Sequence, residues 1–225
     1  LKRHLTQNIS HELKTPVSSI LGYMESILNN PELDSERQRF FIERSFLQAK
    51  RLSALLQDIS MLTKLDEAKG MFEKESCNLL EVISDVLNDL HLQIEQKECT
   101  VLNKVDSAIE ILGNRSLIYS IFRNLLDNAL AYGGEKLTVD INCFRDDDDF
   151  YYFTFSDNGV GVAEEYLNRL FERFYRIDKG RSRKMGGTGL GLAIVKNAVL
   201  YHHGHISAKN LPTGGLSFIF SLKKI

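Results

Sequence analysis

Residues 186–196 read GGTGLGLAIVK, and this stretch indicates how the C-terminal part of the chain folds. The glycines run directly into an apolar helix-forming segment, so backbone N–H groups at the start of a helix are left free to hold phosphates. The stretch is not a Walker loop, because no Gly-Lys-Ser or Gly-Lys-Thr follows it. It is not a dinucleotide fingerprint either, because no strand leads directly into it. A nucleotide site of another kind is therefore indicated.

Two polar motifs upstream fit such a site. Asn124 and Asn128 are four residues apart on a predicted helix, so both amides project from one face, and their neutral oxygens suit Mg²⁺. Asp157 ends a predicted strand, where a carboxylate can accept the exocyclic amine of adenine. Gly159 and Gly161 would let the backbone approach the base. Taken singly, each motif has an ordinary alternative. For Asn124 and Asn128 it is a pair of exposed helix asparagines, and for Asp157 it is a common turn at the end of a strand.

Near the start of the chain, residues 10–16 read SHELKTP within an amphipathic helical pattern. Imidazole attacks a γ-phosphoryl group only when it is neutral and exposed. Glu12 can accept a hydrogen bond from one ring nitrogen of His11 and leave the other free. Thr15 follows one turn later on the same face, and Pro16 is expected to bend the helix. For an isolated His-Glu pair, a surface histidine is the alternative; the downstream motifs favour a phosphoacceptor.

The apolar pattern divides the chain into residues 1–68 and 69–225. In the first part, apolar side chains recur at three- and four-residue steps up to Leu28, where Asn29-Asn30-Pro31 ends the helix. A second helix begins at Asp34 or Ser35 and gives an antiparallel hairpin. Because a lone hairpin covers little of its own apolar stripe, we predict an all-α fold in which two copies pair as a dimeric four-helix bundle.

The second part mixes helices with strands. We predict helices over residues 79–96, 114–131 and 189–201, and strands over residues 98–105, 109–112, 137–144, 150–156, 205–208 and 217–222. This order favours an α/β sandwich with one sheet against one helical layer. His202, His203 and His205 come at a helix end, where cationic side chains favour the helix dipole, and we prefer this to a zinc site.

Composition narrows the function classes. The 225 residues are 43% hydrophobic and 26% charged, which is typical of a soluble globular protein, and the net charge of −2 gives no electrostatic reason to expect nucleic-acid binding. The three cysteines are far apart without a CxxC, so we expect free thiols in a reducing compartment. No run approaches the ~18 apolar residues that span a bilayer. Because the first residue is Leu1 and residues 1–6 already follow a helical pattern, we expect a piece of a longer protein. The family resemblance described next implies that this piece is a cytoplasmic domain and that upstream segments anchor the parent in the cell membrane.

In this order, the motifs resemble the catalytic core of a sensor histidine kinase of two-component signalling, over nearly the whole chain. The resemblance implies a dimerisation and phosphoacceptor hairpin followed by an α/β sandwich ATP-binding domain of the histidine kinase/gyrase type. It implies ATP and Mg²⁺ as cofactors, ATP-dependent autophosphorylation on His11, and phosphotransfer to an aspartate of a response regulator. It also implies phosphatase activity toward that regulator.

The resemblance further assigns roles to single residues. Glu12 assists the transfer, Thr15 positions water for dephosphorylation, and Arg176 stabilises charge on the transferring phosphoryl group. The metal ligands are Asn124 and Asn128. The residues implied in nucleotide binding are Asn124, Asn128, Tyr132, Asp157, Gly159, Gly161, Tyr175, Lys179, Gly187, Thr188, Gly189, Leu190 and Gly191.

The resemblance implies a flexible lid next to residues 170–176, and the basic segment 179–184 is interpreted as a mobile loop there, with a merely solvated basic loop as the alternative. In one departure from the family, Ala131 stands where a lysine, arginine or histidine is typical, so a phosphate-contacting cation is missing.

Two alternatives remain. A conformational ATPase of the same ATP-binding superfamily, as in gyrase or mismatch-repair proteins, would resemble the second domain but would not need SHELKTP on a helical hairpin. A dimeric signalling module that binds nucleotide without phosphotransfer would share both domains. Acid-labile phosphate on His11 separates the kinase from both.

Overall fold

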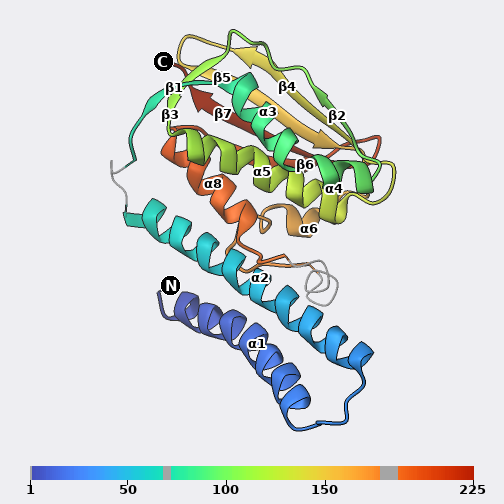
Figure 1. Ribbon diagram of the computed structural model, residues 1–225. Helices are drawn as coiled ribbons and strands as arrows, with labels where there is room; N and C mark the ends of the chain where they lie inside the picture. The colour runs from blue at the N-terminus through green and yellow to red at the C-terminus, as the bar shows by residue number, and fades with distance from the viewer. Residues whose placement is uncertain (1, 68–71, 178–186) are drawn as a thin grey trace.

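The computed structural model describes residues 2–67, 72–177 and 187–225, and the side chains from Gln7 onward. Figure 1 shows a helical hairpin at one end of the molecule and a unit of sheet and helices at the other. In Figure 1, helices α5 and α8 lie between the sheet and the hairpin. None of the helices in the described ranges combines the length and apolarity that crossing a membrane needs.

The hairpin consists of α1 (Lys2–Leu28) and α2 (Ser35–Glu67). Asp34 caps α2, because its Oδ1 accepts a hydrogen bond of 2.8 Å from the backbone N–H of Arg37. Tyr23 of α1 stacks on Phe41 of α2 with the ring centroids 5.7 Å apart. The predicted hairpin is therefore confirmed, and α1 continues through Pro16.

Much of the apolar surface of the hairpin is uncovered in the single chain. Leu55 and Leu62 are buried, but many large apolar side chains of the two helices are exposed. These are Val17, Leu21, Leu28, Phe40, Ile42, Phe46, Leu47 and Leu56. An exposed apolar face of this extent marks an interaction surface.

The second unit contains the remaining elements. Its helices are α3 (Leu79–Asp89), α4 (His91–Gln96), α5 (Arg115–Tyr132), α6 (Glu164–Leu167) and α8 (Gly191–Tyr201). Its strands are β1 (Glu75–Asn78), β2 (Thr100–Asn103), β3 (Glu110–Gly113), β4 (Thr138–Asp146), β5 (Phe150–Asp157), β6 (Ile206–Asn210) and β7 (Leu216–Lys223). Five strands form one sheet in the order β2-β4-β5-β7-β6, with β2 parallel to β4 and the other neighbours antiparallel.

The core of this unit lies between the sheet and helices α3, α5 and α8. Phe220 of β7 packs against Phe153 of β5 and Phe122 of α5, with ring centroids 5.4 Å and 5.9 Å apart. One layer of helices therefore covers one face of the sheet, as the mixed order of elements predicts, and the α/β sandwich is confirmed.

Three elements differ from expectation, and one of them is the short helix α6, which was not predicted. The helix predicted over residues 79–96 is divided at Leu90, whose backbone leaves the helical conformation (φ −103°, ψ 6°) while its side chain is fully buried. Strand β1 has too few apolar residues to be seen in the sequence, and it forms because it pairs with β3, Glu75 opposite Gly113.

The prediction that His202 is cationic is wrong. His202 is 2% exposed. Its Nδ1 lies 2.7 Å from the carbonyl oxygen of Ala198, and its Nε2 accepts a hydrogen bond of 3.1 Å from the backbone N–H of Asn114. Burial lowers the pKa of His202, and Lys74 and His203 lower it further, against the hydrogen bond to Ala198. Gly113 makes room for the ring, because a Cβ there would lie 2.3 Å from Nε2.

Candidate functional site

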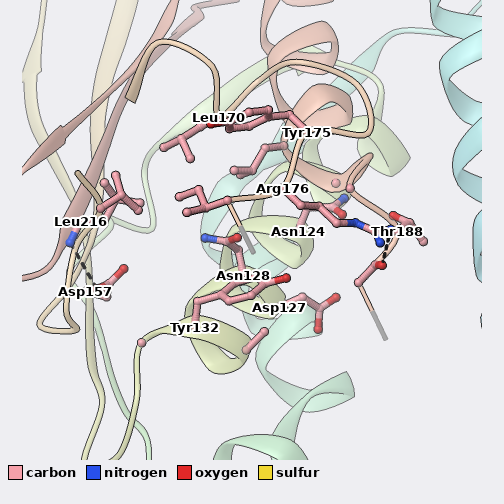
Figure 2. Close-up of a pocket in the computed structure, with 18 of the residues that line it drawn as sticks. Asn124, Asp127, Asn128, Tyr132, Asp157, Leu170, Tyr175, Arg176, Thr188 and Leu216 are labelled. Carbon is pink, nitrogen blue, oxygen red and sulfur yellow. Dashed lines mark hydrogen bonds between the residues drawn. The ribbon is translucent and has the colours of Figure 1, made fainter. Parts of the chain in front are cut away.

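A cavity of about 560 Å³ lies where α5, the end of β5 and the start of α8 meet (Figure 2). Helix α2 of the hairpin contributes Ala54 and Asp58 to its wall. Asp157 and Thr188 lie at opposite ends of the labelled side chains in Figure 2. The cavity is thus long, and its two ends have different chemistry.

At one end, Asp157 is 6% exposed and is fixed by backbone groups. Its Oδ1 accepts hydrogen bonds from the N–H groups of Gly159, at 2.9 Å, and Leu216, at 3.2 Å. Among the described residues, no group hydrogen-bonds its Oδ2. Burial raises the pKa of the Asp157 carboxyl, while the two backbone donors oppose that change. One oxygen is therefore held in place and the other is left for a ligand with a donor.

The turn after Asp157 needs its glycines. A Cβ on Gly159 would lie 2.7 Å from the carbonyl oxygen of Gly133, so a side chain cannot fit between this turn and the end of α5. Gly161 has a positive φ of 66°, which favours glycine. Asn210 then fixes the turn, accepting from Val162 N at 3.0 Å and donating to Val162 O at 2.6 Å.

Along the middle of the cavity, α5 presents Asn124, Asp127, Asn128, Ala131 and Tyr132. Asn124 donates through Nδ2 to the carbonyl oxygen of Ser120 at 2.8 Å, which leaves its Oδ1 as the available atom. A Cβ on Gly191 would lie 2.6 Å from that oxygen, so a glycine at the start of α8 is needed here. Two amide oxygens on one helix face form a donor set that fits a hard cation such as Mg²⁺.

At the other end, Thr188 connects the start of α8 to the hairpin. Its Oγ1 donates a hydrogen bond of 2.7 Å to Asp58 Oδ2 and accepts one of 3.2 Å from the N–H of Leu190. Gly187, Gly189 and Gly191 also line this end, next to the first turn of α8. Free N–H groups at a helix start attract anions.

Arg176 is the cation at this end. Its side chain is 6% exposed, and its Nη2 donates to the carbonyl oxygen of Gly187 at 2.7 Å and to Glu12 Oε2 at 3.3 Å. Its buried Nε has no hydrogen-bond partner among the described residues. Tyr175 lines the cavity beside it, with the guanidinium of Arg169 4.2 Å from the centre of the tyrosine ring.

The residues of the SHELKTP stretch divide between two places. Glu12 reaches Arg176 and also lies 3.6 Å from Arg51 of α2. His11 is exposed, and Thr15 donates through Oγ1 to the carbonyl oxygen of His11 at 3.2 Å. His11 and Thr15 line a separate open hollow on α1 with Lys14, Ser18 and Ser19.

Two family descriptions match the chain. Residues 1–68 match the His Kinase A (phospho-acceptor) domain, and residues 113–225 match the histidine kinase-, DNA gyrase B-, and HSP90-like ATPase family.

The chain belongs to the histidine kinase family.

Curated relatives of this histidine kinase are similar to it in sequence along nearly its whole length. The sensor-like histidine kinase SenX3 of Mycobacterium tuberculosis is 33% identical over 221 residues, which are 98% of this chain and 53% of that protein. The phosphate regulon sensor protein PhoR of Haemophilus influenzae is 33% identical over 228 residues, 99% of this chain and 52% of that protein. The chain thus spans about half the length of these relatives.

Solved structures share the fold of this histidine kinase. The Acinetobacter baumannii histidine kinase AdeS matches with a TM-score of 0.75 at 22% identity, covering 95% of this chain and 98% of that chain. The histidine kinase ThkA, solved in complex with the response regulator protein TrrA, matches with a TM-score of 0.76 at 22% identity, covering 99% of this chain and 61% of that chain. The predicted order of a helical hairpin and an α/β sandwich is thus confirmed, while the family matches and the curated relatives confirm the kinase class and the use of ATP.

Sequence reasoning missed the contribution of the hairpin to the cavity. Asp58 comes three residues after Leu55 and four before Leu62, so a carboxylate interrupts the apolar side of α2. That interruption is the signal that could have identified Asp58. Of the residues predicted for the nucleotide site, Lys179 lies outside the described residues, and Leu190 is buried behind the cavity in a cluster with Leu55 and Leu62.

Proposed function

We propose that this histidine kinase uses ATP to phosphorylate His11 and then passes the phosphoryl group to an aspartate of a response regulator. The observation that carries this proposal is the contact between Arg176 and Glu12. Arg176 belongs to the cavity, and Glu12 is the neighbour of His11, so one hydrogen bond of 3.3 Å connects the nucleotide end of the molecule to the phosphoacceptor helix. We also propose that residues 1–68 form the dimerisation and phosphoacceptor domain and that residues 69–225 form the ATP-binding domain.

ATP would lie along the cavity with its base at Asp157 and its phosphates at Thr188. Asp157 Oδ2 would accept the exocyclic amine of adenine. Tyr132 and Tyr175 would flank the nucleotide. The glycines from Gly187 to Gly191 would offer backbone N–H groups to the phosphates. Lys179, outside the described residues, is proposed as a further nucleotide contact.

Asn124 and Asn128 would hold Mg²⁺ through their amide oxygens. Bound there, the cation would offset the negative charge of the phosphates. Arg176 would stabilise charge that develops on the γ-phosphoryl group, since its Nε is buried without a partner among the described residues.

In the transfer step, a neutral ring nitrogen of His11 forms a bond to the γ-phosphorus, the bond from that phosphorus to the β–γ bridging oxygen breaks, and ADP leaves. Glu12 accepts the proton of the other ring nitrogen. The exposed position of His11 on α1 leaves the ring accessible to a donor and to a second protein. Thr15 would hold the water that removes phosphate from the regulator.

The partners proposed are a second copy of the chain, a response regulator and ATP. The exposed apolar face of the hairpin supports the homodimer. The ThkA–TrrA complex, which carries a kinase of the same fold, supports the regulator. We further propose that the chain is the cytoplasmic part of a membrane-anchored sensor, because its relatives are named sensors and it spans about half of their length.

Incubation with γ-labelled ATP tests the proposal. The wild-type chain should take up label that acid removes and base does not. His11→Gln should take up none and should bind ATP as the wild type does. Undiminished labelling of His11→Gln would mean that the acceptor has been assigned to the wrong residue.

A further inference from the structure

The carboxylate of Asp58 occupies the phosphate end of the cavity. It comes from the hairpin and accepts the hydroxyl proton of Thr188 over 2.7 Å. A threonine hydroxyl has one proton to donate. While Thr188 donates to Asp58, it cannot donate to a phosphate oxygen.

The cation at this end is partly engaged, although its buried Nε has no hydrogen-bond partner among the described residues. Arg176 donates to Glu12 and to the carbonyl oxygen of Gly187. Among the described residues that line the cavity, Arg176 is the one cation, because Ala131 stands at the position where the family commonly has another. The carboxylates on this side of the cavity are Asp58 and, toward the middle, Asp127, which forms an ion pair of 3.0 Å with Arg123. In this arrangement the phosphate end offers little positive charge to a nucleotide.

Packing holds Asp58 in this place. Leu55 and Leu62, on the same face of α2, pack with Leu190, Ala193 and Ile194 at the start of α8. Outside the cavity, Arg173 adds two hydrogen bonds to Asp66, of 2.6 Å and 2.9 Å. Asp58 therefore lies in the cavity as long as α2 and α8 are in contact.

The electrostatic setting of Asp58 is unfavourable for further negative charge. Burial raises the pKa of the Asp58 carboxyl; the hydrogen bond from Thr188 opposes this change and the nearby charge of Asp127 adds to it. A terminal phosphate would bring more negative charge to the same end and would be repelled by the carboxylate of Asp58.

We propose that Asp58 makes the docked arrangement discriminate between nucleotides, accepting ADP and disfavouring the third phosphate of ATP. The inference rests on the proposed nucleotide site. A γ-phosphate then competes with Asp58 for the hydroxyl of Thr188, and binding of ATP loosens α2 from α8. Loss of that phosphate restores the contact. Asp58 acts here as a specificity-determining residue contributed by the other domain.

The test compares Asp58→Asn with the wild-type chain by calorimetric titration. ADP and a non-hydrolysable ATP analogue are each titrated at one fixed, saturating Mg²⁺ concentration. The substitution keeps the size of the side chain and removes its charge. The analogue should bind about tenfold more tightly to the variant, the scale of one charge–charge interaction in a partly buried site. The dissociation constant of ADP should change by less than about twofold.

Asp66→Asn is the matched control. It also removes a carboxylate of α2 that contacts the second domain, through Arg173, but this carboxylate does not line the cavity. It should alter the ratio of the two dissociation constants by less than about twofold. An equal change in both variants would assign the effect to the release of the domains and would overturn the role of the Asp58 charge.

Two other results would also overturn the inference. One is an unchanged ratio of the two dissociation constants in Asp58→Asn, including equal tightening of both nucleotides, and the other is weaker binding of the analogue, which would make Asp58 a metal ligand. If the wild type binds both nucleotides and Asp157→Asn weakens both, the proposed nucleotide site stands in each of these cases. If the wild type binds neither nucleotide, the site itself fails, and the inference with it.

Discussion

At the residue scale, the two oxygens of Asp157 have different tasks. The N–H groups of Gly159 and Leu216 both donate to Oδ1, so that atom must be an acceptor. In Asp157→Asn the amide oxygen would take this place, and the NH₂ group would turn to the cavity. It would then meet the amine of adenine, donor against donor.

Asp157→Asn should therefore weaken ATP binding by roughly 1–3 kcal/mol, which is about a 5- to 150-fold rise in the dissociation constant. Calorimetric titration measures the dissociation constant of ATP for the variant and for the wild type. The melting temperature of the variant serves as the control, since the fold should be retained. ATP binding of normal affinity would show that the base lies elsewhere.

Thr15 and Glu12 lie on the same helix and should separate the two reactions of the phosphoacceptor segment. The hydroxyl of Thr15 lies one turn beyond His11, where it can align a water on the phosphoaspartate of a regulator. Thr15→Ala should lose most phosphatase activity and keep substantial autophosphorylation, whereas Glu12→Ala should mainly lose autophosphorylation.

Both reactions are assayed with the cognate regulator, with Ser19→Ala as the control that removes a helix hydroxyl one turn further on. Loss of kinase activity with intact phosphatase activity in Thr15→Ala would reverse the two roles.

At the element scale, the residue that follows the last turn of α8 is His202, and its ring must stay neutral. Protonated Nε2 of His202 could no longer accept from the N–H of Asn114. The pKa of His202 in the folded chain lies below its unfolded value of 6.5. Below pH 6.5 the unfolded chain therefore binds more protons, and stability falls as the pH falls toward the folded pKa.

As the pH falls from about 7 to 5 this residue should lower the free energy of unfolding, by at most about 2 kcal/mol, which is the ceiling that the unfolded pKa of 6.5 sets. Urea unfolding at both pH values measures the change in the free energy of unfolding. The His202→Gln variant should lack the contribution of His202 to this pH dependence. His205→Gln is the matched control, since the side chain of His205 is exposed and its replacement should leave the pH dependence as it is. An identical pH dependence in all three chains would contradict the account of His202.

The elements that could be predicted are those whose signal is local. The helices of the hairpin, α5, α8 and the long strands each carry their own apolar period, and the site motifs keep fixed spacings at the ends of these elements. What could not be predicted depends on distant partners. Strand β1 exists through its pairing with β3, His202 is buried because Gly113 has no side chain, and Asp58 enters the cavity only because α2 docks on α8.

At the scale of the whole molecule, the uncovered face of the hairpin predicts a homodimer. Phe46 and Leu47 of α2 are 61% and 55% exposed, although both are large and apolar. In a two-fold bundle, Leu47→Glu would place a charge at two equivalent positions of the buried seam.

This variant should raise the dimer dissociation constant at least about 100-fold, as sedimentation equilibrium would detect. Leu92→Glu changes a leucine that is 57% exposed on the second domain, and it should leave the dimer intact. Sedimentation of the wild-type chain as a stable monomer at micromolar concentration would contradict the bundle.

The central claim is that the two halves of the molecule together transfer a phosphoryl group from ATP to His11. The most direct measurement is tandem mass spectrometry of the chain after incubation with Mg²⁺ and ATP, with digestion kept at neutral to alkaline pH. One phosphate should be found, located on His11, lost in acid and retained in base. ATP turnover without protein-bound phosphate, or phosphate located on another residue, would contradict it.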